Sequence, residues 1–248
     1  MIHGDVWGPS KIKNIIVTRW FVSFVDDHTR ISWIFLMKEK SEVSQIFKNF
    51  YNMIQTQFHA KIQVLKINNV RYYFNSILGV FLLKEGVVHQ KFCINTPQQN
   101  GIGERKNRHL LEVARVLMLS SHVPKNFRGK TILTATYLIN RMSSHVWSFQ
   151  TPCKVFLKSY LRTRLISSIP LKLFGCPTFV HIPQQHQNKL DPKATKCIFL
   201  KYSINQKGYK CYFPVSKRFY NSMDVTFLEN RSYYSKTDMQ GENRIREY

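Results

Sequence analysis

Acidic residues are scarce in this chain. Its 248 residues include 14 Asp and Glu against 37 Lys and Arg, which gives a formal net charge of +23 and a pI near 10.0. The first 150 residues carry 20 basic and 8 acidic side chains, and the rest carry 17 and 6. Because both halves share the excess, the chain is expected to bind a polyanion, most simply nucleic acid. A membrane surface is disfavoured, since no strongly basic segment has a clean apolar helical face.

Long apolar runs and paired cysteines are lacking as well. No stretch approaches the ~18 apolar residues of a membrane span. The start, MIHGDVWGPS, has neither the charged nor the apolar region of a signal peptide. We therefore expect a protein of the nucleus or cytoplasm with reduced thiols. The cysteines form no CxxC pair and no zinc pattern, and we expect them to be buried; they are Cys93, Cys153, Cys176, Cys197 and Cys211.

The first 145 residues alternate between strand and helix patterns. Runs of β-branched and aromatic residues predict a hairpin from 15–25 and 31–37, followed by a helix that Ser41 caps. Apolar periodicity predicts the remaining elements: strands at 62–67 and 87–92, and helices at 75–85, 101–121 and 131–142. A hairpin followed by strands that alternate with helices predicts an α/β fold, with a mixed sheet flanked by helices.

The later part of the chain has a different pattern. A less regular basic stretch comes first, and short strands separated by turn residues follow it, which predicts a small β-barrel. These strands are expected at 178–182, 197–202, 209–213, 219–221 and 225–227. The expected domains are therefore a core at 1–145, a basic linker at 146–172, a barrel at 173–230 and a flexible tail at 231–248.

One carboxylate in a basic helix is the main functional signal. The stretch TPQQNGIGERKNRHLL at 96–111 places Glu104 in a first helical turn. Asp5 lies on the expected first strand, and Asn68 follows the strand at 62–67, with 35 residues between positions 68 and 104. Strand ends and a helix start can meet at one sheet edge, where oxygen ligands suit Mg²⁺. Two such ions can activate a water or a 3′-hydroxyl for attack on a phosphodiester.

Each acid also has an ordinary structural explanation. Asp5 alone is typical of a turn, and Glu104 alone is typical of an acid near a helix N-terminus. Their joint spacing favours metal ligation. Asp26 and Asp27 lie at the expected hairpin turn, so a turn-forming role is favoured over replacement of a missing metal ligand.

Several segments match the sequence motifs of a known protein family. They are DVWGP at 5–9, FVDDHTRISW at 24–33, TPQQNGIGERKNRHLLEVAR at 96–115, LFGC at 173–176, and KCIFLKY and KGYKCYFPVSKRFYNSMDVTFLE within 196–229. In these segments the chain resembles the integrase region of a copia-type retrotransposon Pol polyprotein. The resemblance implies a ribonuclease-H-like core and a small Src-homology-3-like barrel. It also implies DNA integration with Mg²⁺ or Mn²⁺, metal held at positions 5, 68 and 104, and DNA and further copies of the chain as partners.

The departures from the family pattern bear on activity. The family's second motif reads roughly Ser-Asp-Asn-Gly-x-Glu-Tyr, whereas Asn68, Val70 and Tyr72 replace its Asp, Gly and Glu here. Lys201 likewise replaces a Gly that is usual in the barrel motif. Asn brings no charge to offset Mg²⁺, and even outer-shell losses cost about 10–100-fold. We therefore expect a weak or inactive integrase or polynucleotidyl transferase, from a degenerate or truncated copy. The alternative is a non-catalytic nucleic-acid binder, either a relic or a domesticated protein.

Three residues beside Glu104 are candidates for DNA binding. Arg108 follows it by four residues on one helix face and can meet a phosphate. Asn100 precedes the helix and Lys106 lies within it. A solvated helix face explains Lys106 equally well.

Overall fold

The computed structural model describes residues 1–10, 17–67, 76–90, 101–144, 148–160, 169–182, 192–203 and 207–235. Contacts divide the chain into two compact units. The first comprises Met1–Leu111 and Thr136–Ile166, and the second comprises Glu112–Ala135 and Ser167–Tyr248. Among the described residues, no helix combines the length and the apolar character needed to cross a membrane.

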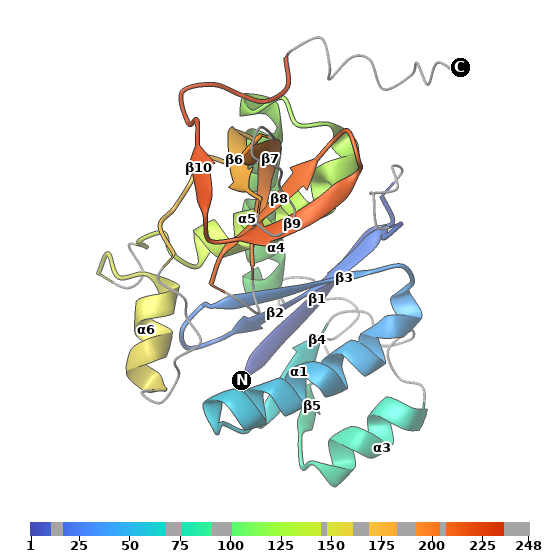
Figure 1. The fold of residues 1–248 in the computed structure, drawn as a ribbon. Coiled ribbons are helices and arrows are strands. Elements are labelled where there is room, and N and C mark those ends of the chain that lie inside the picture. Colours follow the sequence, from blue (N-terminus) through green and yellow to red (C-terminus); the bar gives the residue numbers. More distant parts are fainter. Residues whose placement is uncertain are drawn as a thin grey trace. The chain divides into compact units, whose positions relative to one another are not determined.

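The first unit is built on a mixed five-stranded sheet in the order β3-β2-β1-β4-β5 (Figure 1). The strands are β1 (Ile2–Trp7), β2 (Trp20–Asp26), β3 (Ser32–Met37), β4 (Val64–Ile67) and β5 (Val88–Gln90). Strands β1, β2 and β3 pair antiparallel, while β1–β4 and β4–β5 pair parallel. The hairpin followed by strands that alternate with helices is therefore confirmed.

Side chains cover both faces of β2, whose residues from Phe21 onward are all buried. Helix α1 (Val43–Phe58) packs on one face, where Phe24 stacks on Phe50 with ring centroids 4.6 Å apart. Helix α3 (Ser76–Lys84) packs beside α1 through the rings of Phe81 and Tyr51, 5.4 Å apart. Figure 1 shows α1 lying along the sheet.

Parts of two further helices meet the opposite face of this sheet. They belong to α4 (Gly101–Ser120) and α5 (Arg128–Ile139). Just after α5, the amide of Asn140 accepts from the Ser32 N–H at 3.0 Å and donates to the Ser32 carbonyl at 2.8 Å. These two bonds fix the end of α5 to strand β3.

An additional helix, α6 (Pro152–Ser159), falls in the stretch expected to be irregular. Thr151 caps it by accepting from the Lys154 N–H at 3.2 Å, and Pro152 occupies its first turn. Its buried residues Cys153 and Phe156 pack against Ile31. The basic stretch therefore contributes to the core of the first unit.

The second unit holds a five-stranded antiparallel sheet in the order β10-β6-β7-β8-β9. Its strands are β6 (Pro177–His181), β7 (Ala194–Tyr202), β8 (Tyr209–Phe213), β9 (Arg218–Ser222) and β10 (Val225–Phe227). In the described strands the order stays open, with β9 and β10 at its two ends. Val123, and Phe127 of the 3-10 helix η3 (Lys125–Phe127), pack on Ile198, Leu200 and Tyr212.

Candidate active site

Asp5 lies in the middle of the first unit's sheet and faces α4. Its partner in the antiparallel pairing with β2 is Ser23, and directly opposed residues share one face of a sheet. The Ser23 hydroxyl also donates to the Asp5 carbonyl at 3.3 Å. Asn107 of α4 reaches the Asp5 carboxylate from the same side. The expected position of Asp5 on the first strand is therefore confirmed.

Two donors hold the carboxylate of Asp5. The Asn107 Nδ2 group donates to Oδ2 at 2.8 Å, and the Val6 backbone N–H donates to Oδ1 at 2.9 Å. Asn107 is 4% exposed, and its Oδ1 atom finds no hydrogen-bond partner among the described residues. A cavity of about 10 Å³ adjoins Asn107, barely the volume that one water needs. These contacts fix the orientation of the carboxylate before any ligand arrives.

Electrostatics link Asp5 to Glu104. Burial raises the pKa of Asp5, the charge of Glu104 raises it further, and the bonds from Asn107 and Val6 oppose the increase. Glu104 lies in the first turn of α4, three residues before Asn107, so both side chains lie on one side of the helix. The structure thus brings together two of the three predicted metal-site residues, 99 positions apart in sequence.

The third position lies just past the end of β4. That strand ends at Ile67, whose parallel partner in β1 is Gly4, the residue before Asp5. Asn68 itself is outside the described residues, and so is Asn100. Within the described ranges no cluster of three or more His, Cys, Asp or Glu could hold a metal. Two neighbouring carboxylates that repel each other nonetheless fit a hard divalent cation, since its charge would offset the repulsion.

The two basic candidates on α4 differ in their surroundings. Arg108 is exposed, whereas Lys106 is partly buried and lines the small cavity beside Asn107. Burial lowers the pKa of Lys106 to about 8, and repulsion from Arg30 contributes to the decrease. Arg108 is therefore better suited than Lys106 to meet a phosphate.

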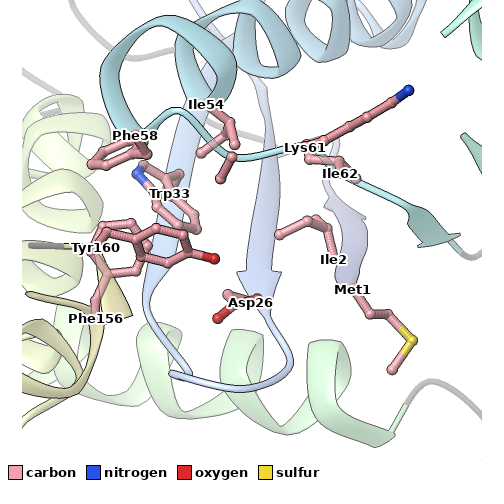
Figure 2. Close-up of a pocket in the computed structure, with 11 residues that line it drawn as sticks. Met1, Ile2, Asp26, Trp33, Ile54, Phe58, Lys61, Ile62, Phe156 and Tyr160 are labelled. Carbon is pink, nitrogen blue, oxygen red and sulfur yellow. The ribbon is translucent and has the colours of Figure 1, made fainter. Parts of the chain in front are cut away.

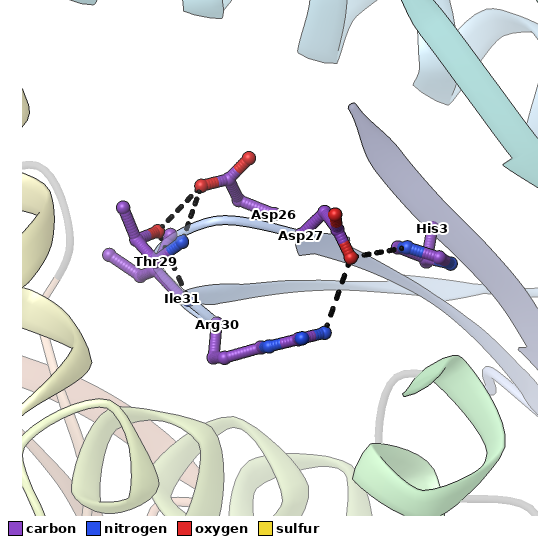
Figure 3. Close-up of polar contacts among 6 residues, drawn as sticks. All are labelled: His3, Asp26, Asp27, Thr29, Arg30 and Ile31. Atoms are coloured by element: carbon purple, nitrogen blue, oxygen red, sulfur yellow. Dashed lines mark hydrogen bonds and ion pairs between the residues drawn. The ribbon is translucent and has the colours of Figure 1, made fainter. Parts of the chain in front are cut away.

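The acids of the hairpin turn have structural partners, as Figure 3 shows. Asp26 Oδ2 accepts from the Thr29 backbone N–H at 2.9 Å and from its hydroxyl at 2.8 Å. Asp27 Oδ1 lies 3.0 Å from His3 Nε2 and 3.4 Å from an Arg30 guanidinium nitrogen. The turn-forming role is confirmed for Asp26, because one carboxylate oxygen closes the turn.

A separate aromatic pocket adjoins this turn (Figure 2). Its cavity is about 40 Å³, too small for a nucleotide. Burial raises the pKa of Tyr160, and the charge of Asp26 adds to the effect. Of the residues predicted for the metal site or for DNA binding, none that the structure describes lines this pocket; its lining includes Asp26, Trp33, Phe58, Phe156 and Tyr160.

The arrangement of elements matches a known class of fold. A chain of the simian T-cell lymphotropic virus intasome, solved by cryoEM in complex with the PP2A regulatory subunit B56 gamma, aligns with a TM-score of 0.50. The alignment covers 92% of this chain and 75% of the other, at 14% identity. The chain thus has the mixed α/β fold of retroviral integrase cores. Residues 176–241 match the retroviral polymerase SH3-like domain, which classifies the second sheet.

Sequence relatives narrow the class further. The chain is 34% identical over 230 residues to the retrovirus-related Pol polyprotein from transposon TNT 1-94 of Nicotiana tabacum. It is 31% identical over 233 residues to the corresponding polyprotein from transposon RE1 of Arabidopsis thaliana. The alignments cover 93% and 92% of this chain but 17% and 15% of the relatives, so the chain spans about a sixth of their length. It is homologous to the Pol polyproteins of plant copia-type retrotransposons, and the expected resemblance is confirmed.

Proposed function

We propose that this chain is a DNA-integration region for strand transfer that depends on a divalent metal ion, and that Asn68 at the second acid position impairs its catalysis. The observation that carries the proposal is the convergence of Asp5 and Glu104 beside the point where β4 ends. The similarity of the chain to the retrovirus-related Pol polyprotein from transposon TNT 1-94 supports the same function. In this proposal Asp5, Asn68 and Glu104 form the metal-binding and catalytic set.

In this proposal, some residues of the site bind the metal ion and others orient the residues that bind it. Asp5 and Glu104 would hold Mg²⁺ or Mn²⁺, which when bound lowers the cost of charge on the reacting phosphodiester oxygens. Asn107 and the Val6 N–H would keep the Asp5 carboxylate oriented toward the ion. Asn68 would add a neutral oxygen only, which leaves the ion's charge less compensated and its binding weaker.

DNA is the proposed partner. We also propose that further copies of the chain bind together with it on the DNA. Arg108 is the foremost candidate for a phosphate contact because it is exposed on α4, one turn beyond Glu104. Lys106 and Asn100 complete the predicted set. Element ends and target DNA would both be substrates, and joining to chromosomal DNA would require the protein in the nucleus.

Strand transfer with purified protein tests the proposal. The unmodified chain is expected to show little or no activity with Mg²⁺ or Mn²⁺, because Asn68 is uncharged. Asn68→Asp should raise activity about tenfold, since that is the smaller loss typical of a perturbed metal shell. Adding Asp5→Asn to Asn68→Asp should abolish the gain. Robust turnover by the unmodified chain that survives Asp5→Asn would contradict the metal-site assignment.

DNA affinity without metal separates Glu104 from Arg108. In EDTA, Glu104→Gln should keep or raise affinity for a duplex, because it removes a negative charge without removing a phosphate contact. Arg108→Ala should weaken binding and reduce the slope of log affinity against log salt by about 1. The reverse result, with affinity lost in Glu104→Gln and kept in Arg108→Ala, would show that DNA binds another face.

A non-catalytic nucleic-acid binder is the second candidate function. The neutral Asn68 and the net charge of +23 favour it. Under this alternative, Asn68→Asp would bind DNA tightly and with steep salt dependence but would not transfer strands with either metal ion.

A further inference from the structure

An irregularity in the second unit's sheet places two lysines side by side. Phe199 of β7 pairs with Cys211 of β8, yet the next pair is Lys201 with Lys210, so Leu200 is an extra residue in β7. Such a bulge changes the direction of the side chains around it. Because directly opposed residues lie on one face of the sheet, the Lys201 and Lys210 side chains share a face.

Helix α5 lies over the same bulge. The Thr134 hydroxyl donates to the backbone carbonyl of Leu200, the extra residue of the bulge, at 2.7 Å. Lys130 precedes Thr134 by one helical turn and therefore lies on the same side of α5. Lys130 is only 9% exposed, in keeping with a position between helix and sheet.

The ring of Phe219 on β9 lies among these lysines. The Nζ atom of Lys130 is 5.1 Å from the ring centroid, and that of Lys210 is 5.6 Å from it. Phe219 in turn packs on Tyr212, with ring centroids 4.8 Å apart. The ring attracts each cation, but it carries no net charge and leaves their mutual repulsion in place.

The positive charge of this cluster has no acidic counterpart in the described ranges. Burial lowers the pKa of Lys130 and of Lys201 to about 8 each, with repulsion from the neighbouring lysines adding to it. The one salt bridge described in this unit joins Lys172 to Glu229 and involves none of the three. Like charges placed directly opposite in a sheet are destabilising, so an anion bound here would relieve a cost that the fold already carries.

We propose that Lys130, Lys201 and Lys210 form a binding site for a phosphate group of a nucleic-acid strand. Lysine ammonium groups suit phosphate as compact cations with several donors. The adjacent ring of Phe219 offers a surface on which a base can stack, which favours a phosphodiester over a free phosphate ion. The inference rests on the proposed nucleic-acid function and adds a contact in the second unit, away from Asp5 and Glu104 in sequence.

The test compares three variants of the full chain that each lose one positive charge. Lys201→Met and Lys210→Met keep an apolar side chain at the cluster, and Lys207→Met removes an exposed lysine of the same unit as the control. Duplex affinity is measured in EDTA over a range of salt, and thermal unfolding is measured with no addition, with duplex and with inorganic phosphate.

Each cluster variant should lose affinity roughly tenfold at low salt and reduce the salt slope by about 1, whereas Lys207→Met should change affinity less than about twofold. Without DNA, Lys201→Met should unfold at a higher temperature than the unmodified chain because repulsion is relieved. Duplex should then stabilise it less than it stabilises Lys207→Met, and inorganic phosphate should have little effect on any variant.

Three results would overturn the site. Equal losses of affinity in Lys201→Met, Lys210→Met and Lys207→Met would show that only total charge matters, while nucleic-acid binding itself would stand. Protection by inorganic phosphate that depends on Lys201, without protection by duplex, would exclude a nucleic-acid strand as the ligand. Absence of duplex binding by the unmodified chain would overturn both this site and the proposed function.

Discussion

The partly buried carboxylate of Asp5 reduces the stability of the metal-free fold at neutral pH. Burial and the charge of Glu104 raise the pKa of Asp5 above its ordinary value of 3.8, so the folded state binds this proton more tightly than the unfolded state does. The free energy of unfolding therefore falls as pH rises from the unfolded pKa through the folded one, and stays lower above it. In its proposed role as a metal ligand, Asp5 is thus unfavourable for stability while the cation is absent.

We predict that Asp5→Asn stabilises the metal-free chain at neutral pH. Asn retains an oxygen that can accept from Asn107, and it removes the partly buried charge. The gain should shrink as pH falls toward the ordinary Asp pKa, where both forms are neutral. Urea unfolding in EDTA at pH 7.5 and pH 4.5 measures it, with Asp27→Asn as the control because Asp27 has cationic partners nearby.

Mn²⁺ should reverse the order of stability of the unmodified chain and Asp5→Asn. The ion should raise the unfolding midpoint of the unmodified chain and leave that of Asp5→Asn nearly unchanged, since stabilisation follows binding to the folded state. A chain that Asp5→Asn destabilises at pH 7.5 in EDTA would show that the carboxylate is held for structural reasons.

At the scale of single residues, the sequence predicts some roles correctly and others wrongly. Asn107 lies three residues before Leu110 and seven before Ala114, on the apolar side of α4, and a polar residue in that series was a readable signal of a buried role. Ser41 was expected to cap a helix, but it lies inside the 3-10 helix η1 (Lys40–Glu42), and Glu42 stands at the N-cap of α1 without a side-chain cap bond. The Glu42 Oε1 atom instead accepts from the Lys38 and Glu39 N–H groups, at 2.9 and 3.0 Å, and so closes the 3-10 turn. N-cap preference alone favours Ser41, and it does not report that a 3-10 turn precedes the helix.

At the scale of elements, the hairpin turn depends on one carboxylate oxygen. Asp26→Ala should lower the free energy of unfolding by about 1–3 kcal/mol, because the Thr29 N–H and hydroxyl lose a charged acceptor in a buried turn. Asp26→Asn keeps an acceptor oxygen and should cost less than half as much. Chemical denaturation of the three proteins measures the difference, and equal losses in both variants would assign the effect to charge and not to the turn.

Elements with strong local sequence patterns were predictable. Helix α6 was missed, and there is a physical reason for this. The long apolar periodicity of α1 and α4 and the β-branched run of β3 located those elements within a few residues, whereas β2 begins at Trp20 and not at the expected residue 15. Helix α6 has eight residues, about two turns, which is too short for a clear period. Its stability comes from packing on Ile31, a contact between residues far apart in sequence.

For the whole molecule, sequence patterns predicted the order of helices and strands along the chain, but not which of them belong to the same compact unit. Boundaries at residues 145, 172 and 230 follow the chain from one end to the other, and they remain a prediction. Spatial contacts assign residues 112–135 to the same unit as the later strands. No local pattern reports that Phe127 will pack on Ile198 and Tyr212.

The buried thiols should act as reporters of each unit. Burial raises the pKa of Cys176 to about 12, that of Cys197 to about 11 and that of Cys211 to about 12. We predict that these three thiols of the second unit resist iodoacetamide at pH 8 in native buffer and react readily in denaturant. Cys153 is buried in the first unit and reports on it separately.

Mass spectrometry after timed alkylation measures the rate at each site. If Cys153 becomes reactive at a lower urea concentration than Cys197, the two units open independently. Reaction of Cys197 or Cys211 in native buffer at the rate of a free thiol would contradict their burial.

The interrupted order of the units has a consequence for synthesis on the ribosome. When residue 166 has been added, every residue of the first unit has been translated, but Val123 and Phe127 still lack the strands that bury them. Those strands come last, between positions 177 and 227. During this interval the nascent chain would present apolar side chains within an otherwise basic surface, which is a substrate that chaperones recognise. Slow codons before the second sheet would prolong that exposure and favour aggregation.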